Sequence, residues 1–255
     1  MSAGDPFRSA AAEVYDRHIG RYSPGLARAL TAGVHGRALD VGCGPGALTS
    51  ELVRVLGADA VCACDPSPPF VEACRKRCPG VRVELAPAES LPFAGAEFDF
   101  TFAQLVVNFL QDPAAGAGEM RRVTRPGGTV RAAVWDYGDA MTLLRTFWEA
   151  AAALDPCAPD EAHMRYMTAA ELEALWAQAG LRDVAVRAEE VSGAYTDYED
   201  LWSPIAGGAG PAGAYVLTLD ADDTAALKAE LRARLEVGER PFTLSARAWV
   251  VEGVV

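Results

Sequence analysis

The chain has 255 residues, of which 51% are hydrophobic and 23% charged, and its formal net charge at pH 7 is −12. This composition indicates a globular protein with a substantial core, in one large domain or a domain with a lid. The negative charge argues against a protein that binds nucleic acid, because such binding depends on basic side chains that neutralise phosphates. No stretch approaches the roughly 18 uncharged apolar residues of a membrane span, so we expect no membrane partner.

The start of the chain and its cysteines both indicate a reducing compartment. Residues 1–8 are polar and lack the apolar stretch of a signal peptide, so we expect a cytoplasmic protein. None of the six cysteines has the paired C-x-x-C spacing of a zinc site. We therefore expect no metal and interpret the cysteines as small buried side chains.

Apolar periodicity predicts strands and helices that alternate along the chain. This alternation is typical of a parallel sheet covered by helices on both faces, and therefore of an α/β fold. A leading helical segment is expected within residues 1–34. The predicted strands cover residues 37–41, 60–64, 81–85, 97–103, 129–135, 181–188 and 242–251.

A glycine-rich segment separates the first strand from the helix that follows it. Gly42, Gly44 and Gly46 have no Cβ, so the backbone can pass close to a ligand. The free N–H groups of the helix start would then point at that ligand. The spacing differs from the G-x-G-x-x-G of dinucleotide sites, because Ala47 stands where the third glycine would be. We infer a nucleotide-type cofactor site that is not built for NAD.

Residues 39–46, Leu-Asp-Val-Gly-Cys-Gly-Pro-Gly, resemble motif I of the class I methyltransferases that use S-adenosylmethionine (SAM). The resemblance covers residues 36–135 and is nearest to the type 11 small-molecule methyltransferases, similar to enzymes of ubiquinone and menaquinone biosynthesis. It implies a SAM site that contains Asp40 and the three glycines, with S-adenosylhomocysteine (SAH) as product. It also implies a Rossmann-like doubly wound sheet of strand order 3-2-1-4-5-7-6, with strand 7 antiparallel and a helical cap.

An acid stands at the end of the second strand, about twenty residues past the glycines. Asp65, with Pro66 beside it, could accept hydrogen bonds from both ribose hydroxyls of a nucleotide. This chemistry serves SAM and NAD equally. Ser67 is expected to cap the next helix, with Pro68 at its first position.

Residues 86–93 resemble the segment with which the family recognises adenine. Pro87 stands where the family has an aspartate, so the side-chain contact to the adenine amino group is missing. The resemblance leaves the backbone N–H of Ala88 as a donor to the ring. Glu89 either replaces the missing acceptor or is a solvated loop residue.

Two further cofactor contacts are implied by the resemblance. Gln104 ends the fourth strand, which in the family lies beside the methionine half of SAM. Tyr15, on the leading helix, stands where the family's tyrosine meets the SAM carboxylate, and His18 is a weaker candidate. Before the fifth strand, residues 125–128 (Arg-Pro-Gly-Gly) predict a tight turn.

The substrate is expected in the half of the chain beyond residue 135. Trp135, Asp136 and Tyr137 end the fifth strand, at the edge where open parallel sheets bind ligands. Trp135, Tyr137, His163 and Trp202 are the predicted substrate contacts. His163 is the first candidate for a general base because its ordinary pKa lies near neutrality, with Asp136 and Tyr137 behind it.

The remaining signals in this half concern its helices. An apolar helix is predicted after Met141, and Thr168 and Glu171 form a capping box for another. The glycine-rich residues 207–213 are read either as a mobile lid or as an ordinary surface loop. A last helix is expected to begin at Asp220 and to end at Gly238.

The predicted function is methyl transfer from SAM to a small, partly apolar molecule by in-line displacement. One alternative is a protein that binds SAM but catalyses another reaction or serves only for binding. A less favoured alternative is an NAD-dependent oxidoreductase, which the glycine spacing and the lack of a Tyr-x-x-x-Lys pair disfavour. A monomer and a homodimer are equally compatible with the sequence. We divide the single domain into a cap (1–34), a SAM-binding core (36–135) and a substrate-side half (136–255).

Overall fold

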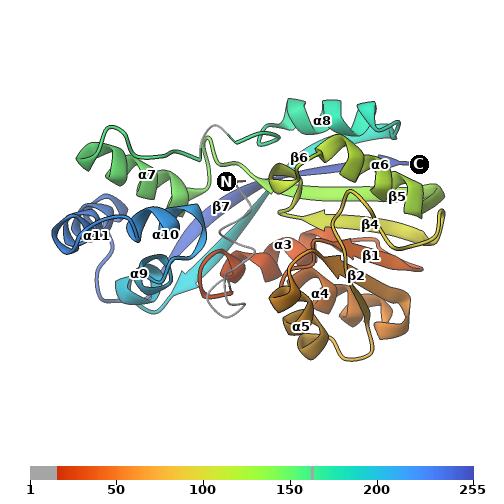
Figure 1. The fold of residues 1–255 in the computed structure, drawn as a ribbon, viewed down its shortest axis with the longest axis horizontal. Coiled ribbons are helices and arrows are strands. Elements are labelled where there is room, and N and C mark those ends of the chain that lie inside the picture. The colour runs from red at the N-terminus through yellow and green to blue at the C-terminus, as the bar shows by residue number, and fades with distance from the viewer. Residues whose placement is uncertain (1–15, 162–163) are drawn as a thin grey trace.

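The computed structural model describes residues 16–161 and 164–255. Within these residues seven strands form one sheet of order β3-β2-β1-β4-β5-β7-β6 (Figure 1). Strands β1 to β5 run parallel, and β7 is antiparallel to both of its neighbours, β5 and β6. The predicted α/β fold and strand order are confirmed. The strands are β1 (Ala38–Val41), β2 (Val61–Asp65), β3 (Arg82–Leu85), β4 (Phe98–Gln104), β5 (Thr124–Trp135), β6 (Arg182–Tyr195) and β7 (Phe242–Val254).

The inner strands are apolar because helices cover both faces of the sheet. Every residue of β1 and of β2 is buried, as expected for parallel strands between two helical layers. The chain steps from β1 to β2 and β3 in one direction and from β4 to β5 in the other, so its right-handed crossovers place helices on opposite faces. These helices are α4 (Ala47–Leu56) and α5 (Pro68–Arg77) on one side, and α6 (Pro113–Val123) on the other. Helix α3 (Ser23–Leu30) packs on α4, and α8 (Ala169–Gln178) packs on α6.

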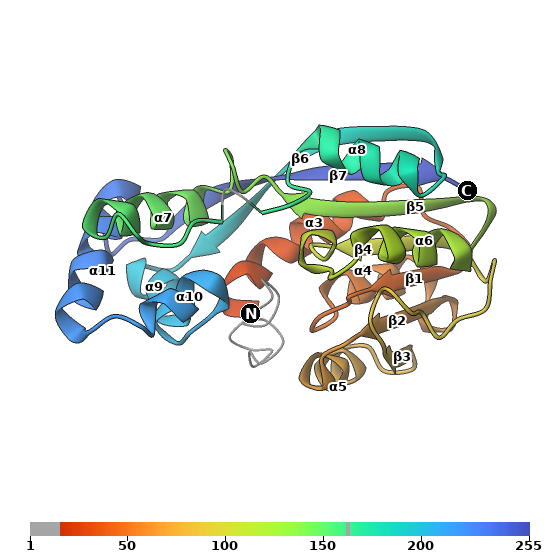
Figure 2. The same cartoon turned by 45° about the horizontal axis from the view of Figure 1, so that its top comes forward.

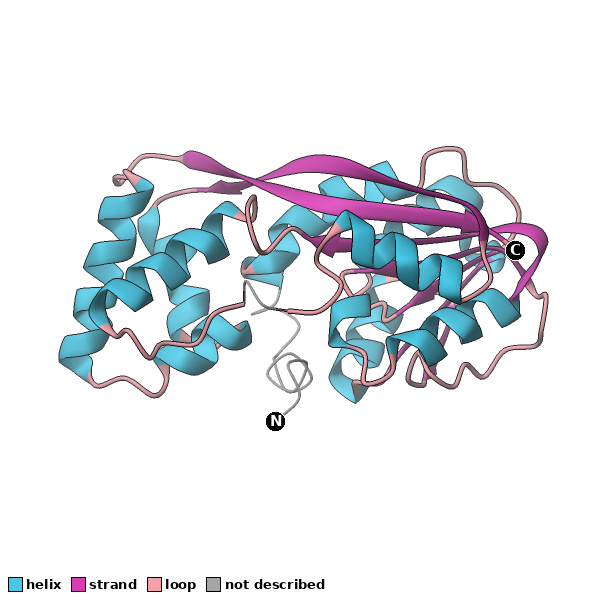
Figure 3. Cartoon of the chain, turned by 90° about the horizontal axis from the view of Figure 1, so that it is seen from above, coloured by secondary structure: helices cyan, strands magenta, loops and turns pink. Residues whose placement is uncertain are grey.

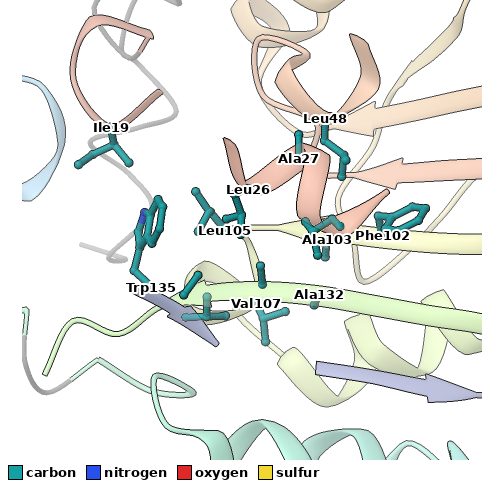
Figure 4. Close-up of a cluster of buried hydrophobic side chains, with 14 of the residues drawn as sticks. Ile19, Leu26, Ala27, Leu48, Phe102, Ala103, Leu105, Val107, Ala132 and Trp135 are labelled. Atoms are coloured by element: carbon teal, nitrogen blue, oxygen red, sulfur yellow. The ribbon is translucent and has the colours of Figure 1, made fainter. Parts of the chain in front are cut away.

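The direction of the connections reverses between β1 and β4, which are hydrogen-bonded neighbours. Open α/β sheets bind ligands at such a point, beyond the carboxyl ends of the strands. The loops that follow β1 and β4 therefore diverge here. The hydrophobic core reaches this edge: Figure 4 shows Trp135, at the end of β5, facing Ile19 of the short helix η1 (Ile19–Tyr22).

Strands β6 and β7 are longer than predicted and project beyond the rest of the sheet. Strand β5 ends at Trp135, opposite Ala248, whereas β6 and β7 remain paired as far as Tyr195 and Phe242. The extra length was missed because the outer part of β6 is half exposed and carries charged residues, which hide the strand pattern. The two strands carry a group of four helices at the far end of the molecule (Figures 2 and 3), which we call the cap lobe: α7 (Thr142–Leu154), α9 (Tyr198–Ala206), α10 (Gly210–Val216) and α11 (Ala221–Leu235).

Residues 207–209 of the glycine-rich segment link α9 to α10, and residues 210–213 lie in the first turn of α10, so the segment is not the ordinary surface loop of one of its two predictions. Gly208 has φ +87°, and Gly210 has φ +63°, conformations that side chains rarely adopt. A Cβ on Gly213 would lie 2.4 Å from the carbonyl carbon of Gly208. The glycines therefore allow two helices to approach closely.

The structure confirms some of the predictions about helix ends and turns and contradicts others. The capping box of Thr168 and Glu171 is present, and the Asp220 side chain caps α11. Helix α11 ends at Leu235, before the predicted Gly238, because Glu236 adopts a left-handed conformation. Residues 125–128 lie within β5 and not in a separate turn, at a register shift between β4 and β5. The other short helices are η2 (Ala58–Ala60) and η3 (Val107–Phe109).

None of the helices in residues 16–161 and 164–255 is long and apolar enough to cross a membrane.

Candidate functional site

A cavity of about 1040 Å³, its open mouth included, lies at the carboxyl ends of the parallel strands. Its walls come from the loops after β1, β2, β4 and β5, from residues 87–89, and from the cap lobe. Nine of the predicted site residues line it: Gly42, Gly44, Asp65, Pro66, Ala88, Glu89, Gln104, Trp135 and Tyr137.

The glycine loop forms one wall at close range. Gly42 has φ +69°, and a Cβ there would lie 2.5 Å from Cγ2 of Val106. The Gly42 N–H donates to the carbonyl of Cys64 at 2.8 Å, which ties the loop to β2. Gly44 has φ +52° and no atom within 4 Å of its ideal Cβ position. The loop thus presents bare backbone to open space, as a cofactor cradle requires.

Asp65 is held rigidly between two loops. Its Oδ2 accepts a hydrogen bond from the Gly44 N–H at 2.9 Å, and its Oδ1 accepts one from the Ser67 N–H at 2.8 Å. Both carboxylate oxygens are therefore oriented by backbone N–H groups of the loops after β1 and β2. The backbone therefore fixes the orientation of the group that the sequence assigned to the ribose.

The 87–89 segment also reaches the cavity. Pro87, Ala88 and Glu89 all line it. Glu89 has a structural task as well, because its Oε1 accepts hydrogen bonds from the N–H groups of Gln111 (3.0 Å) and Asp112 (3.4 Å) before α6. One of its oxygens is therefore already committed.

Asp40 and Gly46 lie behind the glycine loop and are not among the lining residues. The hydroxyl of Thr49 donates to Oδ2 of Asp40 at 2.6 Å, and burial raises the pKa of this carboxyl to about 7. Gly46 has φ +93°, and its ideal Cβ lies 3.0 Å from Sγ of Cys74. Both residues shape the loop from beneath.

Unpaired polar atoms gather in the cavity. Six buried side-chain atoms have no hydrogen-bond partner among the described residues, and four of their residues line this one cavity. They are His18 Nδ1, Gln104 Oε1, Trp135 Nε1 and Glu161 Oε1. Because buried polar groups in folded proteins are almost always hydrogen-bonded, this concentration indicates a site shaped for a polar ligand.

The end of the cavity beneath the cap lobe has aromatic walls. Trp135 and Tyr137 are buried and line it, as predicted for substrate contacts. The ring of Tyr22 meets that of Trp135 edge to face, with 5.9 Å between their centroids. The phenol of Tyr22 in turn bonds that of Tyr195 at 3.0 Å. These contacts hold Trp135 in one orientation.

Asp136 is placed outside the cavity, contrary to its prediction as a catalytic residue. The guanidinium of Arg247 donates to its Oδ2 from Nε (2.9 Å) and from Nη2 (2.6 Å). The Asp136 N–H also donates to the carbonyl of Arg247. The carboxylate therefore joins β5 to β7 and supports the chain where the cap lobe begins.

Trp202 is also placed away from the cavity, contrary to its prediction as a substrate contact. It is buried within the cap lobe and does not line the cavity. The ammonium of Lys228 lies 6.0 Å from the centroid of its ring. Tyr15 and His163 lie outside the described residues, so their predicted roles stay predictions.

The sequence did not single out Glu161, which lines the cavity and is 6% exposed. Its Oε2 accepts a hydrogen bond from the indole N–H of Trp148 at 2.8 Å. Burial raises the pKa of this carboxyl to about 7. Glu161 belongs to no recognisable sequence motif, although it is close in sequence to the predicted His163. Its position in the cavity therefore becomes apparent only from the packing of the cap lobe.

His18 lines the cavity too, from the start of the leading helical segment. Burial, helped by the nearby charge of Arg21, lowers its pKa to about 3. The imidazole is therefore neutral at physiological pH and can accept or donate one hydrogen bond without carrying charge.

No metal site is found among residues 16–161 and 164–255, where no three His, Cys, Asp or Glu side chains gather to hold an ion. All six cysteines are free thiols, and five of them are buried. The exception is Cys157, which is exposed.

The fold and the site resemble those of a known protein class. A sheet of this order with an antiparallel seventh strand, a glycine cradle after β1 and an acid at the end of β2 are typical of the class I SAM-dependent methyltransferases. Residues 39–132 match the family model described as a methyltransferase domain. The matched segment contains the glycine loop, Asp65 and residues 87–89, so this wall of the cavity belongs to a part of the chain that is similar to a methyltransferase domain.

Individual relatives and solved structures show the same similarity. A malonyl-[acyl-carrier protein] O-methyltransferase of Hahella chejuensis is 36% identical over 128 residues, covering 47% of this chain and 45% of that protein. A demethylmenaquinone methyltransferase of Chlorobaculum parvum is 36% identical over 90 residues, 35% of this chain and 37% of that protein. The matches thus span about half or less of these relatives. A candidate type II methyltransferase of Anaeromyxobacter dehalogenans has the same fold, with a TM-score of 0.65, 23% identity, and coverage of 92% and 97% of the two chains.

Proposed function

We propose that the protein transfers the methyl group of SAM to a small, partly apolar molecule. The observation that carries this proposal is the single cavity, which joins the glycine cradle and Asp65 to an aromatic end beneath the cap lobe. One end has the groups that a nucleoside needs, and the other has apolar walls with few polar atoms. That division is typical of a site for a cofactor and a small organic substrate.

The charges of the cavity suit SAM. Asp65 and Glu89 line it beside the glycine loop, and its described lining contains no lysine or arginine. SAM carries a sulfonium and an ammonium, so acids in a partly desolvated cavity favour it electrostatically. Asp65 would hold the ribose hydroxyls, the 87–89 backbone would meet the adenine, and Gln104 would lie toward the methionine half.

When bound, SAM supplies an activated methyl group, so the protein's task is chiefly alignment. Proximity and orientation of this kind correspond to effective molarities of roughly 10⁵–10⁸ M. The glycine loop and Asp65 would fix one reactant, and the walls around Trp135 and Tyr137 would fix the other. The cap lobe supplies Leu144 and Pro211 to the remaining walls, and the connection after α7 supplies Glu161, so these segments help to exclude water.

The experiment is a search for SAH release. The protein would be incubated with SAM and with a panel of small phenols, amines, thiols and acids, and SAH would be quantified by mass spectrometry. We expect SAH and a product 14 Da heavier with at least one class of small acceptor. Tight binding of SAH without turnover of any acceptor would favour a SAM-binding protein with another role. Tight binding of NAD would favour the oxidoreductase alternative.

A further inference from the structure

The end of the cavity beneath the cap lobe holds a carboxyl group that has no cationic partner among residues 16–161 and 164–255. Glu161 is 6% exposed, and its Oε1 has no hydrogen-bond partner among the described residues. Its other oxygen is held by the Trp148 N–H at 2.8 Å, which fixes the direction of the group. Leu144, one turn before Trp148 on α7, lines the same cavity, as does Pro211 of α10.

The charged groups that the structure describes around Glu161 do not neutralise it. Asp160 is its neighbour and carries the same charge, which raises the pKa of Glu161 further. Arg165 does not line the cavity, and its guanidinium donates to the carbonyl of Leu110 at 3.3 Å. His18 shares the cavity but is neutral, because burial lowers its pKa to about 3. An ionised carboxylate in such a place is costly unless a cation reaches it.

We propose that the acceptor molecule is an amine with an apolar body, whose nitrogen is held by Oε1 of Glu161. This inference rests on the proposed function and names its substrate class. The same geometry rejects acceptors that carry a carboxylate or phosphate near the reacting atom, because the described lining offers them acids and no lysine or arginine.

Glu161 also supplies the proton chemistry that an amine needs. An ammonium has no lone pair, so one N–H proton passes to the ionised carboxylate and leaves a neutral amine beside a neutral acid. The nitrogen lone pair forms the new N–C bond while the C–S bond of the methyl donor breaks, with its electron pair left on sulfur. The positive charge of the sulfonium is thereby transferred to the methylated nitrogen, and the proton leaves Glu161 for water after product release.

The test compares three probes of similar size and shape: 2-phenylethylamine, 2-phenylethanol and 3-phenylpropanoate. Their binding to the SAH-saturated protein would be measured by calorimetry, and the Trp148 indole N–H would be followed by NMR. We expect the amine to bind at least about tenfold more tightly than the alcohol, since a charge-assisted hydrogen bond replaces a neutral one. No binding of the carboxylate is expected.

Two variants test whether Glu161 causes the preference for the amine. Glu161→Gln keeps the shape and removes the charge, and should weaken amine binding about tenfold or more while alcohol and SAH binding change less than about twofold. Glu173→Gln makes the same charge change on an exposed face of α8 and should alter the binding of neither the amine, the alcohol nor SAH.

Wild-type amine affinity should be about tenfold weaker at pH 6 than at pH 8, because Glu161 ionises with a pKa of about 7. Glu161→Gln should abolish this dependence.

Several outcomes would overturn the inference. It is wrong if the alcohol or the carboxylate binds as tightly as the amine, or if the amine fails to bind while SAH binds. It is also wrong if Glu161→Gln retains full amine affinity or the pH dependence. If that variant does not fold, the probe ranking and the pH dependence of the wild type decide the question. If SAH itself did not bind, this result would instead contradict the proposed function.

Discussion

The two ends of the cavity are built in different ways. The cofactor end is made by short loops directly after buried parallel strands, and backbone hydrogen bonds fix its key side chain, Asp65. The acceptor end is assembled from side chains far apart in the chain, namely His18, Trp135, Glu161 and Pro211. Local geometry therefore specifies the cofactor, whereas the packing of the cap lobe specifies the acceptor. We therefore expect substitutions at the two ends of the cavity to have different effects on binding and stability.

The largest effect is expected at Gly42. Gly42→Ala places a Cβ 2.5 Å from Cγ2 of Val106 on a backbone with φ +69°, so the loop must move. We expect SAH affinity to fall about a hundredfold or more, since a strained left-handed residue costs roughly 1–2 kcal/mol before the steric clash is added. Calorimetry with SAH measures this loss.

A matched control is Gly118→Ala. Gly118 lies within α6, and nothing lies within 4 Å of its ideal Cβ. This change should leave SAH affinity unaltered and stabilise the protein by about 0.5–1 kcal/mol, because alanine suits a helix interior better. Equal SAH affinities for Gly42→Ala and Gly118→Ala would contradict the proposal that the glycine loop holds the cofactor.

The second effect concerns Asp65. Asp65→Ala removes the proposed acceptor of the ribose hydroxyls and also removes the side chain that binds the Gly44 and Ser67 N–H groups. SAH affinity should fall at least about tenfold, since hydrogen bonds to charged groups contribute about 1.5–3 kcal/mol each. Unchanged affinity by calorimetry would mean that the ribose is held elsewhere.

A third prediction separates structural from catalytic acids at the base of the cap lobe. Asp136→Asn breaks the ion pair with Arg247, whose atoms approach to 2.6 Å. The free energy of unfolding should fall by about 1–3 kcal/mol, the cost of a charged hydrogen bond, with SAH affinity unchanged. Asp139 binds the same guanidinium but its side chain is 79% exposed, so Asp139→Asn should cost under about 1 kcal/mol. Urea denaturation measures both. If Asp136→Asn kept full stability but lost turnover, this result would support a catalytic role for Asp136 and contradict the structural one.

A fourth prediction is a pH dependence of stability from Asp40. Burial raises its pKa to about 7 in the folded protein, above the ordinary value of 3.8. Between these values the folded state binds more protons than the unfolded state, so stability contributed by Asp40 is present below pH 4 and falls as the pH rises to 7. The slope is at most about 1.4 kcal/mol per pH unit. Asp40→Asn should flatten the unfolding free energy over this window in denaturation series, whereas an unchanged slope would assign it to other acids.

The cofactor end was predictable from sequence because one motif and one strand-end acid encode it. The strand order followed from the resemblance over residues 36–135, and nine predicted residues do meet in one cavity. Asp40 lies beneath the loop instead of in the cavity, where its carboxylate accepts a hydrogen bond from Thr49 of α4.

The acceptor end was predicted less well. Trp202 and Asp136 were chosen for residue type and position, but each is used in packing or in an ion pair. Glu161 had no pattern to mark it, because the direction in which a loop acid points depends on long-range packing. The glycines of 207–213 allow close helix contact, a use that composition alone does not distinguish from mobility.

The most direct test of this account is a crystal structure of the protein with SAH. We predict SAH along the Gly42–Gly44 loop, with its ribose hydroxyls on Asp65 and its sulfur facing the end of the cavity that holds Trp135 and Glu161. Oε1 of Glu161 should remain uncovered, with space beside it for a second molecule. SAH bound elsewhere, or SAH whose own amino group occupies Glu161, would contradict the division of the cavity into a cofactor end and an acceptor end.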